Sequence, residues 1–116
     1  MSPVSKTTAA NKLTAVVETL ISEMDRDAPI AQLLAFLVIA TSGSAGISQS
    51  EVQKTLKLST AGMSRTVQAL SALHYFKDRP GFGLVERIID QQDNRFRTLK
   101  LTPKGEKLMQ RVSEVL

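Results

Sequence analysis

Four charged side chains lie close together in the stretch from Ile88 to Gly105. Asp90 and Asp93 come just before Arg95 and Arg97, between two apolar runs that predict the strands of a hairpin. An arginine at a hairpin tip can lie in the minor groove of a DNA duplex, whose negative potential attracts it. An aspartate in the turn can hold that arginine or bond the backbone amides of the turn. In a protein that binds duplex DNA, Arg95 would be the first minor-groove candidate, Arg97 the second and Asp93 their organiser. The alternative is a solvated hairpin end whose local ion pairs each contribute little, and the hairpin alone favours this alternative.

A second group of small and polar residues begins the segment 59–73, whose apolar spacing predicts a helix over 60–73. A helix that enters the major groove needs small or polar side chains at its exposed N-terminal end, so that its backbone can approach the DNA. Arg65 could bond a guanine edge through two hydrogen bonds, and Gln68 could pair with adenine in the same way. The candidate contact residues are Ser59, Thr60, Ala61, Ser64, Arg65 and Gln68. The alternative is an ordinary amphipathic helix with a polar outer face.

The elements before this helix are also predicted to be helical. Apolar residues at helical spacing predict a first helix over residues 11–26. After Pro29, a second helix is apolar on nearly all sides, so we expect it to be the buried central helix. Ser48 to Glu51 form a capping box, which predicts a short helix that begins at Ser48 and ends near Lys57. A short helix, a tight turn and a second helix make a helix-turn-helix.

The residues after the helix-turn-helix predict a two-stranded hairpin and a last helix. We expect strands over residues 84–90 and 95–102, and Thr102 followed by Pro103 predicts a helix start. The predicted order is α-α-α-α-β-β-α, a mainly α fold with a small β-hairpin, known as a winged helix-turn-helix. We expect a flexible tail over residues 1–10 and a single domain over residues 11–116.

The charge of the chain is distributed unevenly along its 116 residues, which carry a net charge of +4. Residues 1–53 hold three Lys and Arg against five Asp and Glu, a net −2, and residues 54–116 hold twelve against six, a net +6. A basic half predicts a polyanion partner, or else a solvated basic surface. The candidates for contacts to the DNA backbone are Lys54, Lys57, Arg87 and Lys100.

Several other classes of protein are disfavoured by the composition. The chain has no cysteine, which excludes a disulfide scaffold and a cysteine-based zinc site. Its single histidine, His74, gives no support for a catalytic triad, so we do not expect an enzyme. We expect no metal and no cofactor. Because no apolar run reaches the length of a membrane span and the start lacks the pattern of a secretory signal, we expect a cytoplasmic, nucleoid-associated protein without membrane contact.

The sequence resembles the MarR (multiple-antibiotic-resistance regulator) family of winged-helix transcription factors. Two segments match. The first is "DQQDNRFRTLKLTPKG" at 90–105, where the family has its wing and its L-x-L-T-x-x-G helix entry. The second is "LSTAGMSRTVQAL" at 58–70, where the family has its recognition helix. The resemblance implies a homodimer that binds a roughly palindromic duplex site, usually as a repressor. By this match Arg95 is the minor-groove arginine and Asp93 organises it.

Three departures from the family pattern stand out. His74 stands where the family usually has a glycine after the recognition helix, and "RPGFG" at 79–83 lengthens the approach to the wing. The long C-terminal helices of the family, which build most of its dimer and effector pocket, are largely missing, so this is a short variant. Whether a small-molecule effector exists is therefore left open.

The first and last helices both carry apolar stripes that a second copy of the chain could cover. The predicted dimerisation helices are residues 11–26 and 103–116. The candidate residues are Leu13, Val17, Leu20, Met24, Leu108, Met109, Val112 and Leu116.

The predicted function is that of a sequence-specific regulator of transcription, a repressor, that binds double-stranded DNA as a homodimer. Two alternatives stay open at this point. One is a DNA-binding winged helix of a mobile element that serves replication, segregation or DNA architecture. The other is a winged helix that binds protein, since a fold does not determine its function.

Overall fold

The computed structural model describes residues 5–72, 80–93 and 96–116, and it has the mainly α fold with a small sheet that the sequence predicts. The helices are α1 (Lys6–Ile21), α2 (Ile30–Ala40), α3 (Gln49–Leu56), α4 (Thr60–Leu70) and α5 (Pro103–Val115). A short 3-10 helix, η1, covers Gly43–Ala45, and the strands are β1 (Ile47–Ser48), β2 (Val85–Ile89) and β3 (Arg97–Leu101).

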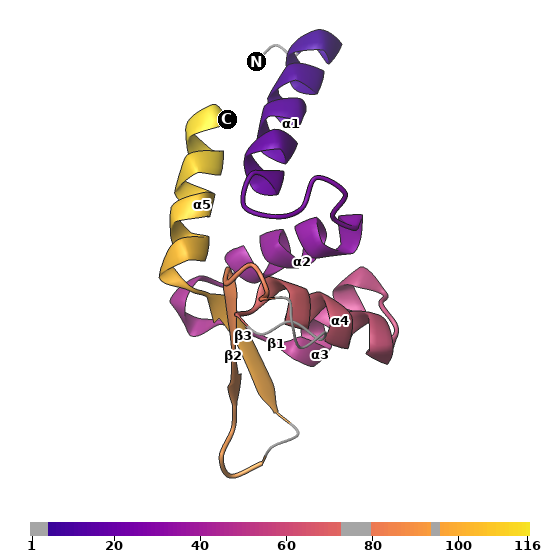
Figure 1. Ribbon diagram of the computed structural model, residues 1–116, viewed down its shortest axis with the longest axis vertical. Coiled ribbons are helices and arrows are strands. Elements are labelled where there is room, and N and C mark those ends of the chain that lie inside the picture. Colours follow the sequence, from indigo (N-terminus) through magenta and orange to yellow (C-terminus); the bar gives the residue numbers. More distant parts are fainter. Residues whose placement is uncertain (1–4, 73–79, 94–95) are drawn as a thin grey trace.

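Helix α2 crosses the middle of the molecule (Figure 1). Helices α1 and α5 lie side by side on one side of it, so the start of α1 and the end of α5 are found there. Helices α3 and α4 and the hairpin of β2 and β3 lie on the other side. The predicted helix-turn-helix and the hairpin, which we call the wing, are thus at the end of the molecule opposite the termini. None of the helices in the described ranges is long and apolar enough to cross a membrane.

The hydrophobic core forms where α2 meets the elements on both sides. Phe36 and Ile39 of α2 are completely buried, which agrees with the predicted central helix. The other large side chains of the core include Leu20, Val52, Met63, Val67, Leu70, Leu84, Leu99 and Leu108. One side of this apolar helix stays at the surface, where Ile30 and Leu34 are 68% and 43% exposed.

The sheet has three strands instead of the two that were predicted. β2 and β3 pair antiparallel, as expected, and β1 adds to the other edge of β3 through the pairs Ile47–Leu99 and Ser48–Thr98. The sequence signal missed β1 because the strand has only two residues and its alternation cannot be distinguished from a loop. It ties the start of α3 to the base of the wing.

Side-chain caps begin three helices, and the helix starts predicted at Ser48 and Thr102 are confirmed. The side chains of Ser48, Ser59 and Thr102 each accept a hydrogen bond from the amide three residues on, at 3.1, 2.9 and 3.1 Å. Pro103 is the first residue of α5, as predicted. Each cap satisfies an amide that a helix start otherwise leaves unpaired.

Several helix boundaries differ from the prediction. Helix α1 begins at Lys6 and not at residue 11, because Ser5 caps it, so the predicted tail over residues 1–10 overlaps a helix. It ends at Ile21, before the predicted end near residue 26. Helix α4 ends at Leu70, since Ser71 is extended, and residue 73 of the predicted helix lies outside the described residues.

The loop after α1 is held to that helix by an exposed ion pair. Arg26 donates two hydrogen bonds of 2.7 and 2.9 Å to the Glu18 carboxylate. These hydrogen bonds, with the charge of Arg26, hold the pKa of Glu18 below its ordinary value.

Candidate nucleic-acid interface

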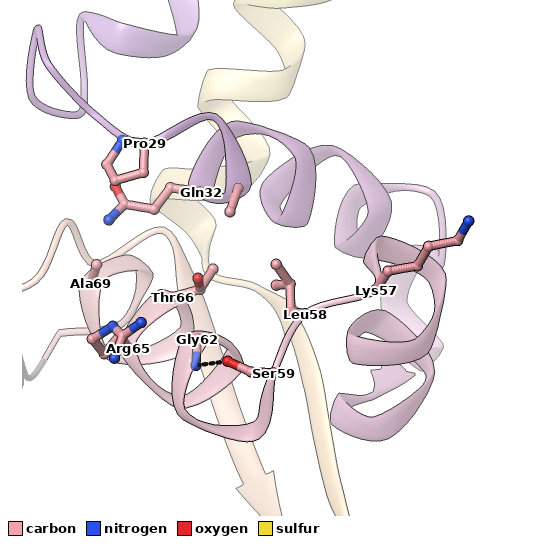
Figure 2. A pocket seen from close by; sticks show the side chains of 10 residues that line it. Pro29, Gln32, Lys57, Leu58, Ser59, Gly62, Arg65, Thr66 and Ala69 are labelled. Carbon is pink, nitrogen blue, oxygen red and sulfur yellow. Dashed lines mark hydrogen bonds between the residues drawn. The ribbon is translucent and has the colours of Figure 1, made fainter.

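Helix α4, the predicted recognition helix, exposes its N-terminal turn. Ser59, Thr60, Ala61 and Arg65 are exposed, as the prediction requires. The opposite face of the helix faces the core and buries Met63, Thr66, Val67, Ala69 and Leu70. Thr66 points toward α2 (Figure 2). The start of α4 therefore offers small side chains, backbone amides and one guanidinium to a ligand.

Two further residues predicted on this helix are less available. Ser64 and Gln68 are part-buried, and the Gln68 amide nitrogen lies 3.5 Å from the Ser64 hydroxyl. The Gln68 Oε1 atom is buried and has no hydrogen-bond partner in the structure as described. A contact between Gln68 and a base would therefore require its side chain to turn outward.

The turn between α3 and α4 depends on an unusual backbone conformation at Lys57. Its φ of 57° lies in the left-handed region, and it is the only residue other than glycine with a positive φ in the described ranges. The amides of Lys57 and Leu58 bond to the carbonyls of Lys54 and Gln53 at 3.3 and 3.0 Å, which is a Schellman ending. This ending fixes the direction in which α4 leaves α3. Lys54 and Lys57 are both exposed at the turn, as expected of backbone contacts.

A cleft of about 450 Å³ separates the start of α2 from α4 (Figure 2). Pro29, just before α2, and Gln32 line one side of it, and Ser59, just before α4, Arg65 and Thr66 line the other. Its volume is within the range of small-molecule sites. No group of three or more metal-ligating side chains occurs among the residues that can be described.

The wing carries its basic residues on two faces. Cross-strand pairs share a face of a sheet, so the pairs Arg87–Leu99 and Ile89–Arg97 place Arg87 and Arg97 together, both exposed. Lys100 pairs with Glu86 on the opposite face, and their charged groups are 3.8 Å apart. The structure thus brings together the predicted residues Arg87 and Arg97 but separates them from Lys100.

The turn of the wing is organised by an aspartate that was not among the predicted site residues. The Asp90 carboxylate accepts a hydrogen bond of 2.8 Å from the Gln92 amide. The backbone closes the turn through Asp90 N to Phe96 O and Phe96 N to Asp93 O, both 3.0 Å. An Asx-turn at Asp90 is a local signal that the sequence already contained. Residues 94 and 95 lie outside the described residues, so the predicted role of Arg95 stays a prediction.

Residues 81–84 join the wing to the C-terminal end of α4. Their amides donate to the last carbonyls of the helix and to those just beyond it, which includes Phe82 N to Ala69 O and Leu84 N to Leu70 O, both 2.8 Å. A Cβ atom on Gly81 would lie 1.8 Å from the Ser71 carbonyl oxygen, so only glycine fits there. The segment "RPGFG" was predicted to lengthen the approach to the wing. From Pro80 on, this segment is a connection that packs on α4. We call residues 81–84 the wing anchor.

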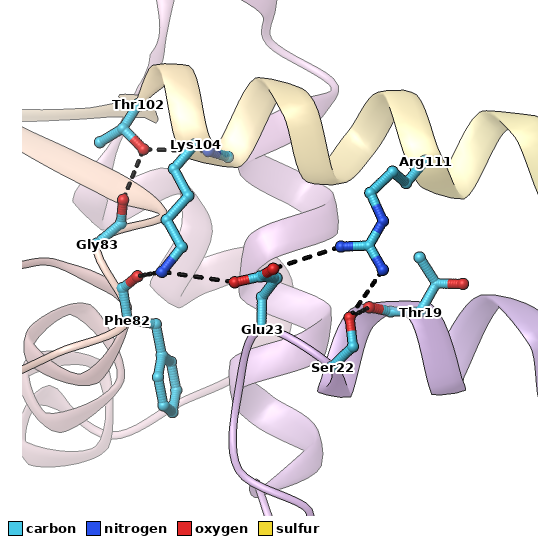
Figure 3. Close-up of polar contacts among 9 residues, drawn as sticks. Thr19, Ser22, Glu23, Phe82, Gly83, Thr102, Lys104 and Arg111 are labelled. Atoms are coloured by element: carbon cyan, nitrogen blue, oxygen red, sulfur yellow. Dashed lines mark hydrogen bonds and ion pairs between the residues drawn. The ribbon is translucent and has the colours of Figure 1, made fainter.

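Helix α5 holds the wing anchor from its other side (Figure 3). Thr102 donates to the Gly83 carbonyl at 2.6 Å, and Lys104 donates to the Phe82 carbonyl at 2.8 Å. Lys104 and Arg111 both pair with the Glu23 carboxylate, at 3.5 and 3.4 Å. The end of α1, helix α5 and the base of the wing therefore form one connected unit.

The predicted dimerisation residues divide into two sets. Leu20, Leu108 and Val112 are buried in the core of the single chain, so we no longer assign them to a contact surface. Met24 and Met109 are partly buried against the core. The exposed members are Leu13, Val17 and Leu116.

The fold has known counterparts among solved structures. MepR from S. aureus, solved as a complex with DNA, matches 95% of this chain and 79% of its own, with a TM-score of 0.69 and 19% identity. MarR matches 92% of this chain and 74% of its own, with a TM-score of 0.59 and 20% identity. The PcaV transcriptional regulator from Streptomyces coelicolor, solved with its natural ligand, matches 97% and 76%, with a TM-score of 0.57 and 20% identity.

Sequence comparison adds no nearer match, since no family model and no curated protein matches the chain. At 19–20% identity the likeness concerns the fold alone. The order of the elements, the three-stranded sheet and these counterparts agree. The chain has a MarR-like winged-helix fold.

Proposed function

We propose that this chain is a transcriptional regulator that binds double-stranded DNA sequence-specifically as a homodimer, and that it acts as a repressor. The observation that carries the proposal is the position of α4 and the wing. Both lie at the same end of the molecule, and both expose basic residues there, Arg65 on α4 and Arg87 and Arg97 on the wing. A duplex laid across that end would meet both elements.

In this proposal α4 enters the major groove and the wing reaches the adjacent minor groove. The exposed start of α4 suits close approach to bases and phosphates. Arg95 and Arg97 are the proposed minor-groove arginines, and Lys54 and Lys57 are proposed to contact phosphates. The wing anchor supports this mode, because it fixes the wing relative to α4 through backbone hydrogen bonds. The working location would be the nucleoid in the cytoplasm, and repression would follow from occupation of a promoter.

The proposal is tested by selection and titration. Duplexes would be selected by the protein from a randomised pool, and binding anisotropy would then be measured on a selected duplex and on a scrambled one. We expect the selected duplex to bind about a thousandfold more tightly, which is within the range for specific sites. Affinity for both duplexes should fall as salt rises from about 50 to 200 mM, because phosphate contacts release counterions.

Three other results would each contradict a different part of the proposal. If both duplexes bind equally, the role in regulation is wrong and a role in DNA architecture or replication replaces it. If neither binds at low salt, DNA is not the ligand and a protein partner for the same surface would be sought. If specific binding at a promoter raises transcription in vitro, the protein is an activator and not a repressor.

A further inference from the structure

The outer half of the wing exposes three large apolar side chains. Ile88 and Ile89 are each 44% exposed and Phe96 is 60% exposed. Single exposed apolar residues are common on protein surfaces. Here, however, all three belong to the outer half of one hairpin that projects from the body of the molecule (Figure 1), and the register places Ile88 and Phe96 on one face and Ile89 on the other. Ile88 and Ile89 lie on the edge strand β2, and Phe96 lies next to the turn. An exposed apolar surface on an edge strand promotes aggregation unless a partner covers it.

The backbone of Phe96 is held through both its carbonyl and its amide. Its carbonyl accepts from the Asp90 amide and its amide donates to the Asp93 carbonyl, both at 3.0 Å. The Asp90 side chain further stiffens the turn through Gln92. The aromatic ring is thus presented to solvent from a fixed backbone, and a preorganised side chain loses little entropy when a partner binds it.

The charges of the wing indicate the chemistry of that partner. Arg97 follows Phe96 directly in the chain, so Arg97 and Arg87 are exposed on the face of the hairpin opposite the ring. Asp90 lies across from Phe96, and its carboxylate is engaged by the Gln92 amide. A hairpin with an apolar ring on one face and cations on the other suits a groove that contacts both faces, and the minor groove offers base pairs between two rows of phosphates. A hydrophobic protein surface that enclosed the tip would have to bury these arginines without a matching charge, which is costly.

We propose that Phe96 is a wedge that enters the minor groove, inserts its ring between two base pairs and kinks the duplex. The inference rests on the proposed DNA binding and adds a residue that determines specificity. Partial unstacking costs least at pyrimidine–purine steps such as TA. Phe96 would therefore select such a step beneath the tip of each wing without forming a hydrogen bond to any base.

The test uses a duplex that the wild-type protein has selected from a randomised pool. Its bend would be measured by energy transfer between dyes at the two ends, and 2-aminopurine placed at successive positions would report unstacking. We expect a bend of about 20–90° and a rise in 2-aminopurine fluorescence at one step in each half-site. Phe96→Ala should abolish both signals and weaken binding about tenfold, the scale of one lost aromatic–base contact.

Two further variants separate the wedge from other effects. Phe96→Leu keeps an apolar wedge and should retain most of the bend. Ile30→Ala removes a side chain of similar exposure, 68%, from the start of α2 and should change neither signal. Thermal unfolding by circular dichroism should show all three variants folded, since both residues are exposed.

The outcomes distinguish a failed wedge from failed DNA binding. If the wild type binds the selected duplex without bending it, or if Phe96→Ala keeps the bend and the fluorescence, the wedge is wrong and the proposed function stands. If Phe96→Ala instead changes the sedimentation of the free protein, the ring contacts a second copy and the wedge is wrong. If no duplex is selected, the proposed function and the wedge fail together.

Discussion

Arg65 and Lys57 are both exposed cations beside the same helix-turn-helix turn, yet their backbones differ. Arg65 sits in the regular helix α4, where its side chain alone determines what it can contact. Lys57 has a left-handed backbone, a conformation that costs a residue with a side chain about 1–2 kcal/mol. A glycine would adopt this conformation without that cost. The presence of lysine at a position that favours glycine suggests that its charge is useful there.

Arg65→Ala should weaken binding to a selected duplex by about 1–3 kcal/mol and relax the preference at one base position, because a bidentate contact is lost. Competition anisotropy against a set of single-base variants of the duplex measures both effects. Arg26→Ala removes an exposed arginine from the loop after α1, which pairs with Glu18 and is not among the proposed DNA contacts, and serves as the control. Equal losses on all variants of the duplex would mean that Arg65 contacts only phosphate.

Lys57→Gly and Lys57→Gln should have the same effect on DNA binding but different effects on stability. Both remove a charge, so each should reduce the slope of log affinity against log salt by about 1. The glycine variant also removes the left-handed strain and should gain up to about 1 kcal/mol in the free energy of unfolding, after the entropy cost of glycine is subtracted. Urea unfolding and a salt series measure the two effects. An unchanged slope would remove Lys57 from the proposed phosphate contacts.

At the scale of elements, the wing anchor determines how the wing and α4 lie relative to each other. Residues 81–84 bond to the end of α4 on one side and receive hydrogen bonds from Thr102 and Lys104 on the other. Two elements that contact neighbouring grooves must keep a constant separation to bind tightly, because flexibility between them would cost entropy on binding. The close approach at Gly81 makes this separation depend on a single residue.

Gly81→Ala should destabilise the fold by roughly 1–3 kcal/mol, because the new Cβ would clash with the Ser71 carbonyl and push the anchor off α4. It should also weaken DNA binding under conditions where the variant remains folded. Urea unfolding followed by anisotropy measures both. Gln91→Ala, an exposed change in the same wing, should leave stability unchanged. A Gly81→Ala variant with wild-type stability would show that the anchor can shift at little cost.

At the scale of the whole molecule, the pair of helices α1 and α5 and the proposed DNA surface lie at opposite ends (Figure 1). Glu23 connects α1 to α5 through Arg111, and through Lys104 to the base of the wing. A second copy that packs on α1 would therefore contact a body that is continuous with the wing. The exposed residues Leu13, Val17 and Leu116 are the proposed contact surface.

Leu13→Lys should convert a dimer to a monomer, because it places a charge on a surface that the partner would otherwise cover. Sedimentation measures the mass, and anisotropy compares duplexes with two half-sites and with one. We expect at least about a tenfold loss on the two-site duplex and little change on the other, because the two binding events are no longer linked. Asn11→Lys adds the same charge on another side of α1 as a control. A wild-type protein that sediments as a monomer at all concentrations would contradict the proposed dimer.

The sequence by itself determined the features that depend on residues close together in the chain. The caps at Ser48, Ser59 and Thr102 are local hydrogen bonds, and the helix starts at Ser48 and Thr102 were predicted from them. The order of the helices and the hairpin followed from the spacing of apolar residues. The helix-turn-helix and its exposed residues on α4 were predictable for the same reason, because a helix face repeats within a few positions of the chain.

Only the tertiary structure decided the features that join distant parts of the chain. Whether Ile47 and Ser48 form a strand depends on the approach of Leu99, about fifty residues away. Whether Leu20 or Leu13 faces the core depends on where α5 packs, although both belong to one apolar stripe. Apart from its glycines, the segment 81–84 has no local sequence feature that predicts its docking on α4. These features depend on which surfaces of the folded chain meet. The free energy of such a contact depends on both segments, so neither segment alone predicts it.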